Sequence, residues 1–345
     1  VYKRQGKQSW YGQTSGIWQS VWLEIRHCSH LCSLKLTPDL DRNQIAVESR
    51  LADRAIAGDL TACVSVFGPD EALVNQTQVD VAPSANLAVT FTLEKPAIRW
   101  SPDEPALYRV HLALKKGSKK LDEIEDSCGF RTVEARDGRI YLNGRPLYLR
   151  GALDQAYYPD TIYTPPSLAL LERQLRQAKD LGFNCLRCHI KIEDPRYYAL
   201  ADRMGMLIWA ELPNWIHWTP AAATRAEETF EAMVARDWNH PSIIAWTLIN
   251  EDWGTDLVND DEHRQWLVEF FQRAKALDPT RLIVDNSPCH PNAHVISDID
   301  DYHHYRVIPD NAAAWSQWVC DFATRPEWTW TPEYSQLRKA DAPLI

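Results

Sequence analysis

The sequence predicts a multidomain chain in which an antiparallel β-sandwich precedes a parallel (β/α) barrel. Three observations support this fold class. Short alternating segments of β character fill the region from Ile17 to about Ala135. After Asp137-Gly138, segments of strand character alternate strictly with amphipathic helices. The 345 residues, of which 45% are hydrophobic, suffice for two or three folded domains.

Alternation of apolar and polar residues predicts five strands in the first region. They are expected at residues 21–26, 45–48, 60–67, 87–93 and 108–114. Turn-forming pairs such as Pro38-Asp39 and Gly117-Ser118 separate them. Several short strands at this spacing are typical of an immunoglobulin-like sandwich.

The second region predicts six strands and five helices in alternation. The strands are expected at residues 146–151, 183–190, 206–212, 243–250, 281–285 and 299–305, and the helices at 166–181, 195–203, 222–238, 262–277 and 311–322. Strict alternation indicates a parallel sheet covered by helices. No glycine-rich phosphate turn follows the first strand, which disfavours a doubly wound nucleotide-binding sheet. Pro343-Leu344-Ile345 is expected to begin a seventh strand, so the barrel is expected to be incomplete.

Composition disfavours several classes of partner. A formal net charge of −10 repels a phosphate backbone, so no nucleic-acid partner is expected. No apolar run approaches the roughly 20 residues that cross a bilayer, so no membrane partner is expected. The eight cysteines lack paired metal spacing and are expected to be buried free thiols, which favours a reducing, cytoplasmic location. Residues 1–5 read VYKRQ, which matches a translated sequencing adapter, so the natural N-terminus is not expected here.

The most informative stretch is SIIAWTLINEDWGTD, from Ser242 to Asp256. Its apolar run predicts a strand that is buried on both faces, and this run stops at Asn250-Glu251. The carboxyl ends of barrel strands carry catalytic groups, because only this rim faces substrate. Glu251 is therefore the first candidate for chemistry, although the pair could instead cap the loop and helix that follow.

Four ordered motifs resemble glycoside hydrolase family 2, which includes β-galactosidases, β-glucuronidases and β-mannosidases. They are Ser15-Gly16-Ile17-Trp18 with Val21-Trp22-Leu23-Glu24, Trp100-Ser101-Pro102 with Pro105-Ala106-Leu107-Tyr108, Gly129-Phe130-Arg131 leading to Leu142-Asn143-Gly144-Arg145-Pro146 and Arg150-Gly151, and Asn250-Glu251. The resemblance implies that residues 6–31 are the end of a jelly-roll sugar-binding domain. It also implies an immunoglobulin-like sandwich over residues 32–135 and a truncated TIM barrel over residues 136–345.

By this resemblance the protein is a retaining exo-β-glycosidase that acts by double displacement. Glu251 is expected to be the acid/base, a role that needs a raised pKa while the glycosyl-enzyme forms. Asn250 is expected to contact the sugar 2-hydroxyl. Arg187 resembles the arginine that orients the nucleophile, although a barrel-internal ion pair is an equal alternative, and Tyr305 resembles the tyrosine that donates to the nucleophile.

The nucleophile itself is expected beyond Ile345, at the end of strand seven, so this chain by itself is expected to be inactive. Glu211, Asp301 and Glu333 are other carboxylates in the barrel region. None has the matching strand position. Each is expected to serve rim hydrogen bonding or surface charge instead.

Further substrate-binding candidates follow the predicted strands. Trp215 and Trp218 could stack on sugar faces, or they could pack a long loop over the barrel. Asp154 is an unexplained polar group after strand one. His303 and His304 beside Tyr305 could be rim ligands, and His304 is the one chosen as a substrate-binding candidate. The metal-ligand pattern of some galactosidases is absent because Trp215 stands where a carboxylate would be needed, so no metal is expected.

No cofactor is expected, and the expected partner is a carbohydrate substrate. A noncatalytic carbohydrate-binding protein of the same architecture is the alternative, since a fold does not fix a function. An interaction module with a vestigial barrel is a third reading, disfavoured because Arg187 and Asn250-Glu251 occur together. The sequence leaves open the sugar, the linkage and homo-oligomer formation by the full-length protein.

Overall fold

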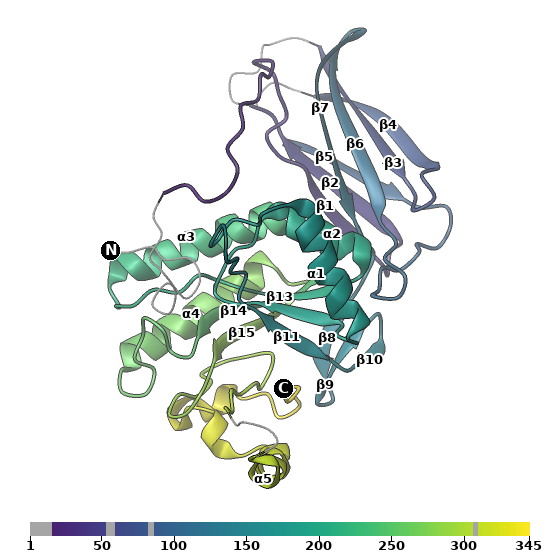
Figure 1. Ribbon diagram of the computed structural model, residues 1–345. Helices are drawn as coiled ribbons and strands as arrows, with labels where there is room; N and C mark the ends of the chain where they lie inside the picture. The colour runs from purple at the N-terminus through teal and green to yellow at the C-terminus, as the bar shows by residue number, and fades with distance from the viewer. Residues whose placement is uncertain (1–15, 53–58, 82–85, 306–309) are drawn as a thin grey trace.

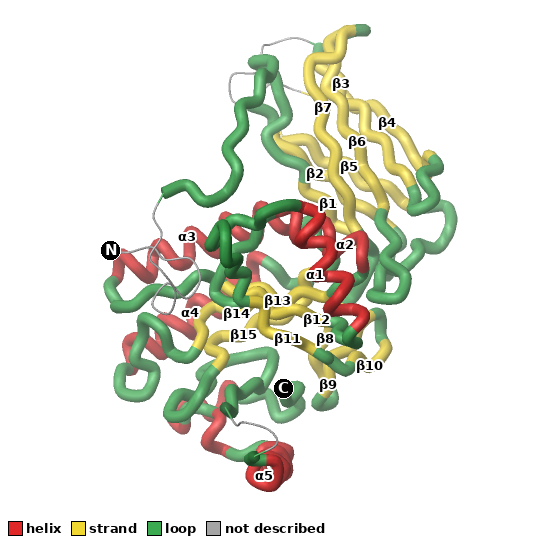
Figure 2. The backbone as a smooth tube through the Cα atoms, in the orientation of Figure 1, coloured by secondary structure: helices red, strands yellow, loops and turns green. Residues whose placement is uncertain are grey.

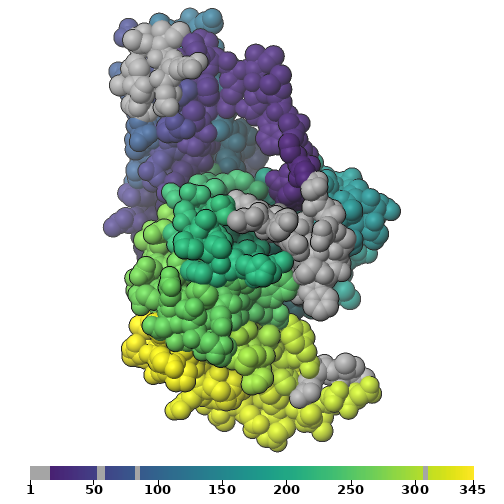
Figure 3. Space-filling model, turned by 90° about the vertical axis from the view of Figure 1, so that its left-hand side faces the viewer, coloured from purple at the N-terminus to yellow at the C-terminus, as the bar shows by residue number. Residues whose placement is uncertain are grey.

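The computed structural model describes residues 16–52, 59–81, 86–305 and 310–345. The segment VYKRQ at residues 1–5 lies outside the described residues. The purple and blue residues of the sandwich lie at one end of the molecule, the green residues of the barrel lie in the middle, and the yellow C-terminal residues lie at the other end (Figure 3).

Seven strands form the sandwich in two antiparallel sheets (Figure 1). One sheet has the order β1-β2-β5 and the other β4-β3-β6-β7. The strands are β1 (Lys35–Asp39), β2 (Gln44–Arg50), β3 (Leu60–Phe67), β4 (Leu73–Val81), β5 (Asn86–Thr92), β6 (Tyr108–Lys116) and β7 (Lys119–Cys128). Inward-facing residues such as Val47, Val64 and Val110 are fully buried between the sheets. The predicted sandwich is therefore confirmed.

Strands β1, β4 and β7 were not predicted, and each lies at the edge of a sheet. Edge strands have one ladder partner and tolerate polar or proline residues. Pro38, predicted in a turn, lies within β1, and β7 carries the acidic run from Asp122 to Asp126. Their weak alternation follows from this exposure.

The predicted strand at residues 21–26 is wrong. Val21, Leu23 and Ile25 are 75%, 90% and 97% exposed, and this segment is in no strand. Alternation alone does not make a strand, because the backbone groups also need a ladder partner, and the described residues provide none here.

The barrel region contains a five-stranded parallel sheet in the order β11-β12-β13-β14-β15 (Figure 2). The strands are β11 (Gly151–Asp154), β12 (Cys185–Cys188), β13 (Leu207–Glu211), β14 (Ile243–Asn250) and β15 (Leu282–Ser287). The helices are α1 (Leu168–Asp180), α2 (Pro195–Met204), α3 (Pro220–Asp237), α4 (Asp261–Leu277) and α5 (Ala312–Ala323), and two short 3-10 turns, η1 (Glu327–Thr329) and η2 (Pro332–Leu337), follow. All five predicted helices are present. Strand one lies later than predicted.

Residues 146–147, expected in strand one, belong to a different sheet. Strand β10 (Arg145–Leu147) pairs with β9 (Arg139–Leu142), which pairs with β8 (Val133–Arg136) through a turn at Asp137-Gly138. Ile140 and Leu142 of β9 join Trp100 and the inward-facing strand residues in one apolar cluster. This small sheet therefore closes the amino-terminal end of the barrel interior.

The sixth predicted strand is present only as a chain of isolated pairings. His303 N donates to Pro288 O at 2.8 Å, beside a parallel bridge with Cys289. On the other side, Asp300 N donates to Pro343 O at 2.8 Å and Tyr302 N to Ile345 O at 3.1 Å. Residues 299–305 thus hold the position of a barrel strand between β15 and residues 343–345.

Polar contacts fix the sandwich to the amino-terminal end of the barrel strands and to the helix ends beside it. Asn239 accepts from Leu36 N at 2.8 Å and donates to Leu34 O at 2.8 Å. Arg131 donates to three backbone oxygens around the starts of β14 and β15, and Trp100 donates to Asp202 O at 2.9 Å. The carboxyl ends of the parallel strands face away from this junction and remain available for a site.

Candidate active site

Strand parity brings the polar side chains of the barrel rim together. Cys185, Leu207 and Trp209 lie in the interior cluster, whereas Leu186 and Ile208 pack against the helices. Because side chains alternate along a strand, Arg187 and Glu211 must also face the interior, at the carboxyl ends of β12 and β13. Asn250 ends the neighbouring strand β14.

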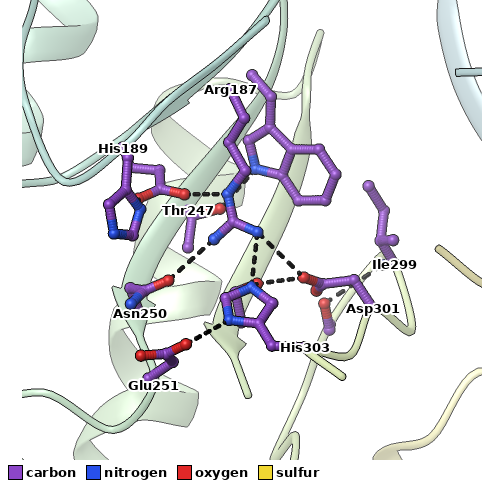
Figure 4. A network of polar contacts seen from close by, with 12 residues as sticks. Arg187, His189, Thr247, Asn250, Glu251, Ile299, Asp301 and His303 are labelled. Carbon is purple, nitrogen blue, oxygen red and sulfur yellow. Dashed lines mark hydrogen bonds and ion pairs between the residues drawn. The ribbon is translucent and has the colours of Figure 1, made fainter. Parts of the chain in front are cut away.

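Arg187 is the centre of this polar network (Figure 4). Its Nε donates to Glu211 Oε1, its Nη2 to Asn250 Oδ1 at 3.1 Å, and its Nη1 lies 2.9 Å from His303 Nε2. Asp301 Oδ2 is 3.6 Å from Nη1. Burial disfavours the charge, but Glu211 and Asp301 outweigh it and raise the pKa of Arg187. Both readings of Arg187, an internal ion pair and a site residue, are compatible with these contacts.

Glu211 is a buried anion held by three donors. Besides Arg187, His189 Nδ1 lies 3.0 Å from Oε2 and Ile190 N donates to Oε2 at 2.6 Å. Burial alone would raise its pKa, but the charge of Arg187 and the bond from His189 lower the pKa of Glu211 to about 2. A carboxyl group in this state accepts hydrogen bonds and does not donate protons near neutral pH.

Asn250 is fully buried, and its own position is held by Asn214, whose Oδ1 accepts from Asn250 N at 2.8 Å. The Oδ1 atom of Asn250 accepts from Arg187. Its Nδ2 has no hydrogen-bond partner among the described residues. One donor at the rim is thus left unused in the described part of the chain, which is costly unless a ligand or water meets it.

Glu251 follows Asn250 in a left-handed backbone conformation with φ of 52°. This turn carries its side chain off the strand direction and toward His303, whose Nδ1 is 2.7 Å from Glu251 Oε1. Tyr305 Oη donates to the same oxygen. A non-glycine residue at positive φ is uncommon, and this conformation persists only where the surrounding structure holds the backbone in it.

Two cavities of about 430 Å³ each adjoin this network. The first lies inside the barrel and is lined by Arg187, Asp301, His303 and Tyr305 together with apolar residues of β11 to β13. The second is lined by Glu251 and by Trp215, with the intervening turn residues. Glu251 therefore lies between them: it bonds to residues of the first and lines the second.

Trp215, but not Trp218, shares a cavity with Glu251. The Trp215 indole donates to Gly254 O at 3.0 Å, and its ring packs against Trp266 with a centroid distance of 5.9 Å. Gly254 has φ of 80°, and a Cβ there would lie 2.4 Å from the Trp215 ring. Trp218 instead packs against His263 and Trp266, with ring centroids 4.2 and 4.7 Å away. The loop-packing alternative holds for Trp218.

Two other predicted residues face away from the network. Asp154 accepts from Tyr197 Oη at 2.9 Å and from Ala156 N at 2.8 Å, which explains it as a local structural acceptor. His304 stacks on Trp318 of α5 at 4.2 Å with nearly parallel rings. The structure brings neither residue to Arg187.

The network contains two histidines that were not chosen as substrate-binding candidates: His189, which contacts Glu211, and His303, which contacts Arg187 and Glu251. The signal for His303 was present in the sequence, because Asp301, His303 and Tyr305 alternate along the sixth strand position and so share one face. His304 has the opposite parity. Of the remaining carboxylates, Asp301 accepts from Ser287 Oγ, while Glu333 lies exposed in η2.

Comparison with known proteins decides the family. A family model described as glycosyl hydrolases family 2, TIM barrel domain, matches residues 133–327, and a second model, glycosyl hydrolases family 2, matches residues 29–131. The chain belongs to glycosyl hydrolase family 2. The suspected family and the sandwich-plus-barrel fold class are thereby confirmed.

Relatives of this family 2 chain carry two activity names. A beta-galactosidase of Enterobacter cloacae is 32% identical over 296 residues, which are 77% of this chain and 27% of that protein. A putative beta-glucuronidase of Formosa agariphila is 28% identical over 275 residues, 77% of this chain and 33% of that protein. The chain thus spans about a third or less of the length of these relatives.

Solved structures of family 2 enzymes share the fold. A beta-glucuronidase of Parabacteroides merdae has a TM-score of 0.69 at 23% identity, covering 85% of this chain and 38% of that one. A Bifidobacterium dentium beta-glucuronidase complexed with coumarin-3-O-glucuronide has a TM-score of 0.73 at 20% identity, covering 88% and 52%. At these identities the likeness establishes the fold alone.

Neither a metal centre nor a spanning helix is found in this family 2 chain as far as it is described. Across residues 16–52, 59–81, 86–305 and 310–345, no group of three or more His, Cys, Asp or Glu side chains is placed to hold a metal ion. Among the helices that these ranges contain, none is long and apolar enough to cross a membrane. The expectations about metal and cofactor stay predictions.

Proposed function

We propose that the protein is a retaining exo-β-glycosidase in which Glu251 is the general acid/base. One observation carries the proposal: Glu251 lies at the carboxyl end of β14, lines a cavity with Trp215, and contacts a network centred on Arg187. Relatives named beta-galactosidase and beta-glucuronidase support it. The activity belongs to the whole protein, since the chain spans about a third or less of those relatives.

In this proposal the protonated Glu251 donates to the glycosidic oxygen as the bond breaks, and the resulting carboxylate later takes a proton from water. Its Oε1 accepts from Tyr305 and faces His303 Nδ1. Asn250 Nδ2, a buried donor with no partner in the described chain, would meet the sugar 2-hydroxyl.

The nucleophile is assigned to neither Glu211 nor Asp301. Glu211 already accepts from Arg187, His189 and Ile190 N, and Asp301 from Ser287 Oγ. A carboxylate that attacks an anomeric carbon needs an accessible oxygen, and both side chains are at most 3% exposed. Trapping with a 2-fluoro glycoside and mapping the labelled peptide would identify the nucleophile directly.

The substrate is proposed to be a β-linked sugar that binds in the cavity lined by Trp215 and Glu251. Galactosides and glucuronides are the first substrates to test, because the relatives are named for them. The polar groups seen at the rim, Asn250, Glu251, His303 and Tyr305, would bind hydroxyl groups and do not by themselves select between these sugars.

Glu251→Gln in the full-length protein tests the acid/base role. We expect kcat/KM on alkyl glycosides to fall about 100-fold or more, because their leaving groups need a proton. Hydrolysis of dinitrophenyl glycosides should lose far less in the bond-breaking step, and added azide should yield a glycosyl azide. Glu228→Gln, an exposed position on α3, is the matched control. An equal loss on both substrate types would refute the assignment.

The noncatalytic carbohydrate-binding alternative differs in one measurable respect. A binder would bind the sugar in a calorimetric titration without consuming it. The unmodified protein and Glu251→Gln would then both hydrolyse the sugar only at the background rate. Turnover that depends on Glu251 excludes that alternative.

A further inference from the structure

His303 links Glu251 to Arg187 and Ser287. Its Nδ1 lies 2.7 Å from Glu251 Oε1, and its Nε2 lies 2.9 Å from Arg187 Nη1 and 3.0 Å from Ser287 Oγ. These partners come from three different strands, β12, the end of β14 and β15. The side chain is 16% exposed, so its orientation is fixed by these contacts rather than by solvent.

The protonation state of His303 follows from its partners. A guanidinium group has only donors, so Arg187 Nη1 can approach Nε2 at 2.9 Å only if Nε2 is an acceptor. The remaining proton of a neutral imidazole must then be on Nδ1, which donates it to Glu251 Oε1. The arrangement therefore selects the neutral Nδ1–H tautomer.

Ser287, His303 and Glu251 are spaced like a serine–histidine–carboxylate triad. The direction of their hydrogen bonds, however, excludes Ser287 as a nucleophile for acyl transfer. The single hydroxyl proton of Ser287 is donated to Asp301 Oδ2, and Arg187 occupies the acceptor nitrogen of His303. Ser287 is also fully buried. A base without a free lone pair cannot activate this hydroxyl.

We propose that His303 is the positioning residue of Glu251, which holds Oε1 through Nδ1–H and is itself oriented by Arg187 through Nε2. The inference rests on the proposed function of Glu251. Its consequence is that the position of the Glu251 carboxyl group at the rim depends on the imidazole of His303.

The charged and polar groups that face His303 come from several elements. Arg187 faces it from β12, the carboxylate of Glu251 from the end of β14, and the Ser287 hydroxyl from β15. Cys289 pairs with it through the backbone, and its own segment contributes Asp301 and Tyr305. A second proton on the ring would be placed on Nε2, against the Arg187 guanidinium.

Two amide substitutions test the roles of the two imidazole nitrogens of His303 one at a time. Asn at position 303 places an amide near Nδ1 and can still donate to Glu251, whereas Gln places one near Nε2 and can still accept from Arg187. Ala removes both. We expect kcat/KM of His303→Ala to fall about 10-fold or more. His303→Asn should recover most of that loss, and His303→Gln should not.

The pH dependence of kcat/KM distinguishes a positioning role from a purely structural one, because a purely structural role of His303 would leave the basic limb unchanged. A donor to the ionised carboxylate lowers the pKa of Glu251, so removing it raises that pKa and moves the basic limb of kcat/KM upward by about one pH unit in His303→Ala. His303→Asn should keep the limb of the unmodified protein. His111→Asn, in β6 of the sandwich, is the control.

A second measurement does not need activity. Heteronuclear NMR of the imidazole nitrogens should show His303 as the neutral Nδ1–H tautomer at neutral pH, and Arg187→Lys should weaken this preference. An Nε2–H tautomer, an unmoved basic limb in His303→Ala, or equal rescue by Asn and Gln would overturn the proposal. If Glu251→Gln lost activity equally on all substrates while the tautomer was as expected, the proposed function would fail and the His303 geometry would stand.

Discussion

Arg187 and Glu211 form a buried ion pair across the carboxyl ends of the adjacent parallel strands β12 and β13. The Glu211 side chain is 1% exposed, and the pair is completed by bonds from His189 and Ile190 N. Arg187 therefore presents its two remaining nitrogens, Nη1 and Nη2, toward His303 and Asn250 in a fixed direction.

Replacing Glu211 with Gln should destabilise the protein. The change keeps the shape but leaves the Arg187 charge without its main partner, and breaking a buried pair in this way costs about 3 to 5 kcal/mol. Urea unfolding measures it. Glu172→Gln, which breaks an exposed pair with Arg176 on α1, is the matched control and should cost under about 0.5 kcal/mol. Similar losses in the two variants would contradict the role of the buried pair.

The stability contributed by Glu211 should disappear in acid. Its folded-state pKa, about 2, lies below its ordinary value of 4.5, because Arg187 and His189 outweigh the effect of burial. A depressed pKa gives stability that is complete above about pH 4.5 and lost as pH falls through about 2. The gap in unfolding free energy between the unmodified protein and Glu211→Gln should therefore narrow over that range. A constant gap from pH 5 to pH 2 would be inconsistent with this assignment.

His294 should show the opposite pH dependence. Burial disfavours its charge, but the bond to Asp285 at 2.8 Å and the nearby Asp301 raise the pKa of His294 to about 9. A raised pKa gives stability that is complete below the ordinary value of 6.5 and lost as pH rises through about 9. The advantage of the unmodified protein over His294→Gln should shrink between pH 6.5 and 9, as measured by chemical unfolding. His111→Gln, on the sandwich, serves as the comparison.

Trp215 and Trp218 should differ in their effect on catalysis. Trp215 lines the cavity beside Glu251, whereas Trp218 packs on His263 and Trp266. We expect Trp215→Phe to lower kcat/KM about 10-fold, since aromatic contacts of this kind contribute about 0.5 to 1.5 kcal/mol beyond area burial. Trp218→Phe should change kcat/KM by less than about twofold and act mainly on stability. The reverse ranking would show that the cavity beside Glu251 is not the sugar site.

The errors in the predicted sandwich are three unpredicted edge strands and one false strand without a pairing partner among the described residues. Strands β2, β3, β5 and β6 were predicted because their inward-facing residues are apolar and alternate. The missed strands β1, β4 and β7 are edges with polar surfaces, and the false strand at residues 21–26 has no ladder partner in the described chain. Pairing is a property of two segments, and one segment cannot reveal it.

In the candidate site, too, residues marked by a local sequence pattern were found, whereas contacts between distant segments were not. Asn250-Glu251 was found because an uninterrupted apolar strand ends there, and Arg187 because a charge interrupts an apolar run. His303 and His304 were both considered as rim ligands and His304 was chosen, although alternation with Asp301 and Tyr305 could have separated them. The predicted contact of Tyr305 with a nucleophile cannot be seen here, where its hydroxyl donates to Glu251.

The sequence by itself determined the family, the order of sandwich and barrel, the five helices and the strand end that carries Glu251, because periodicity and local motifs are written along the chain. Only the tertiary structure decided which polar groups meet. His303 reaches Arg187 across 116 residues and Glu251 across 52, and Asp154 and Trp218 turn to local partners instead. Such contacts depend on strand order, parity and backbone turns acting together, and no single stretch of sequence contains all three.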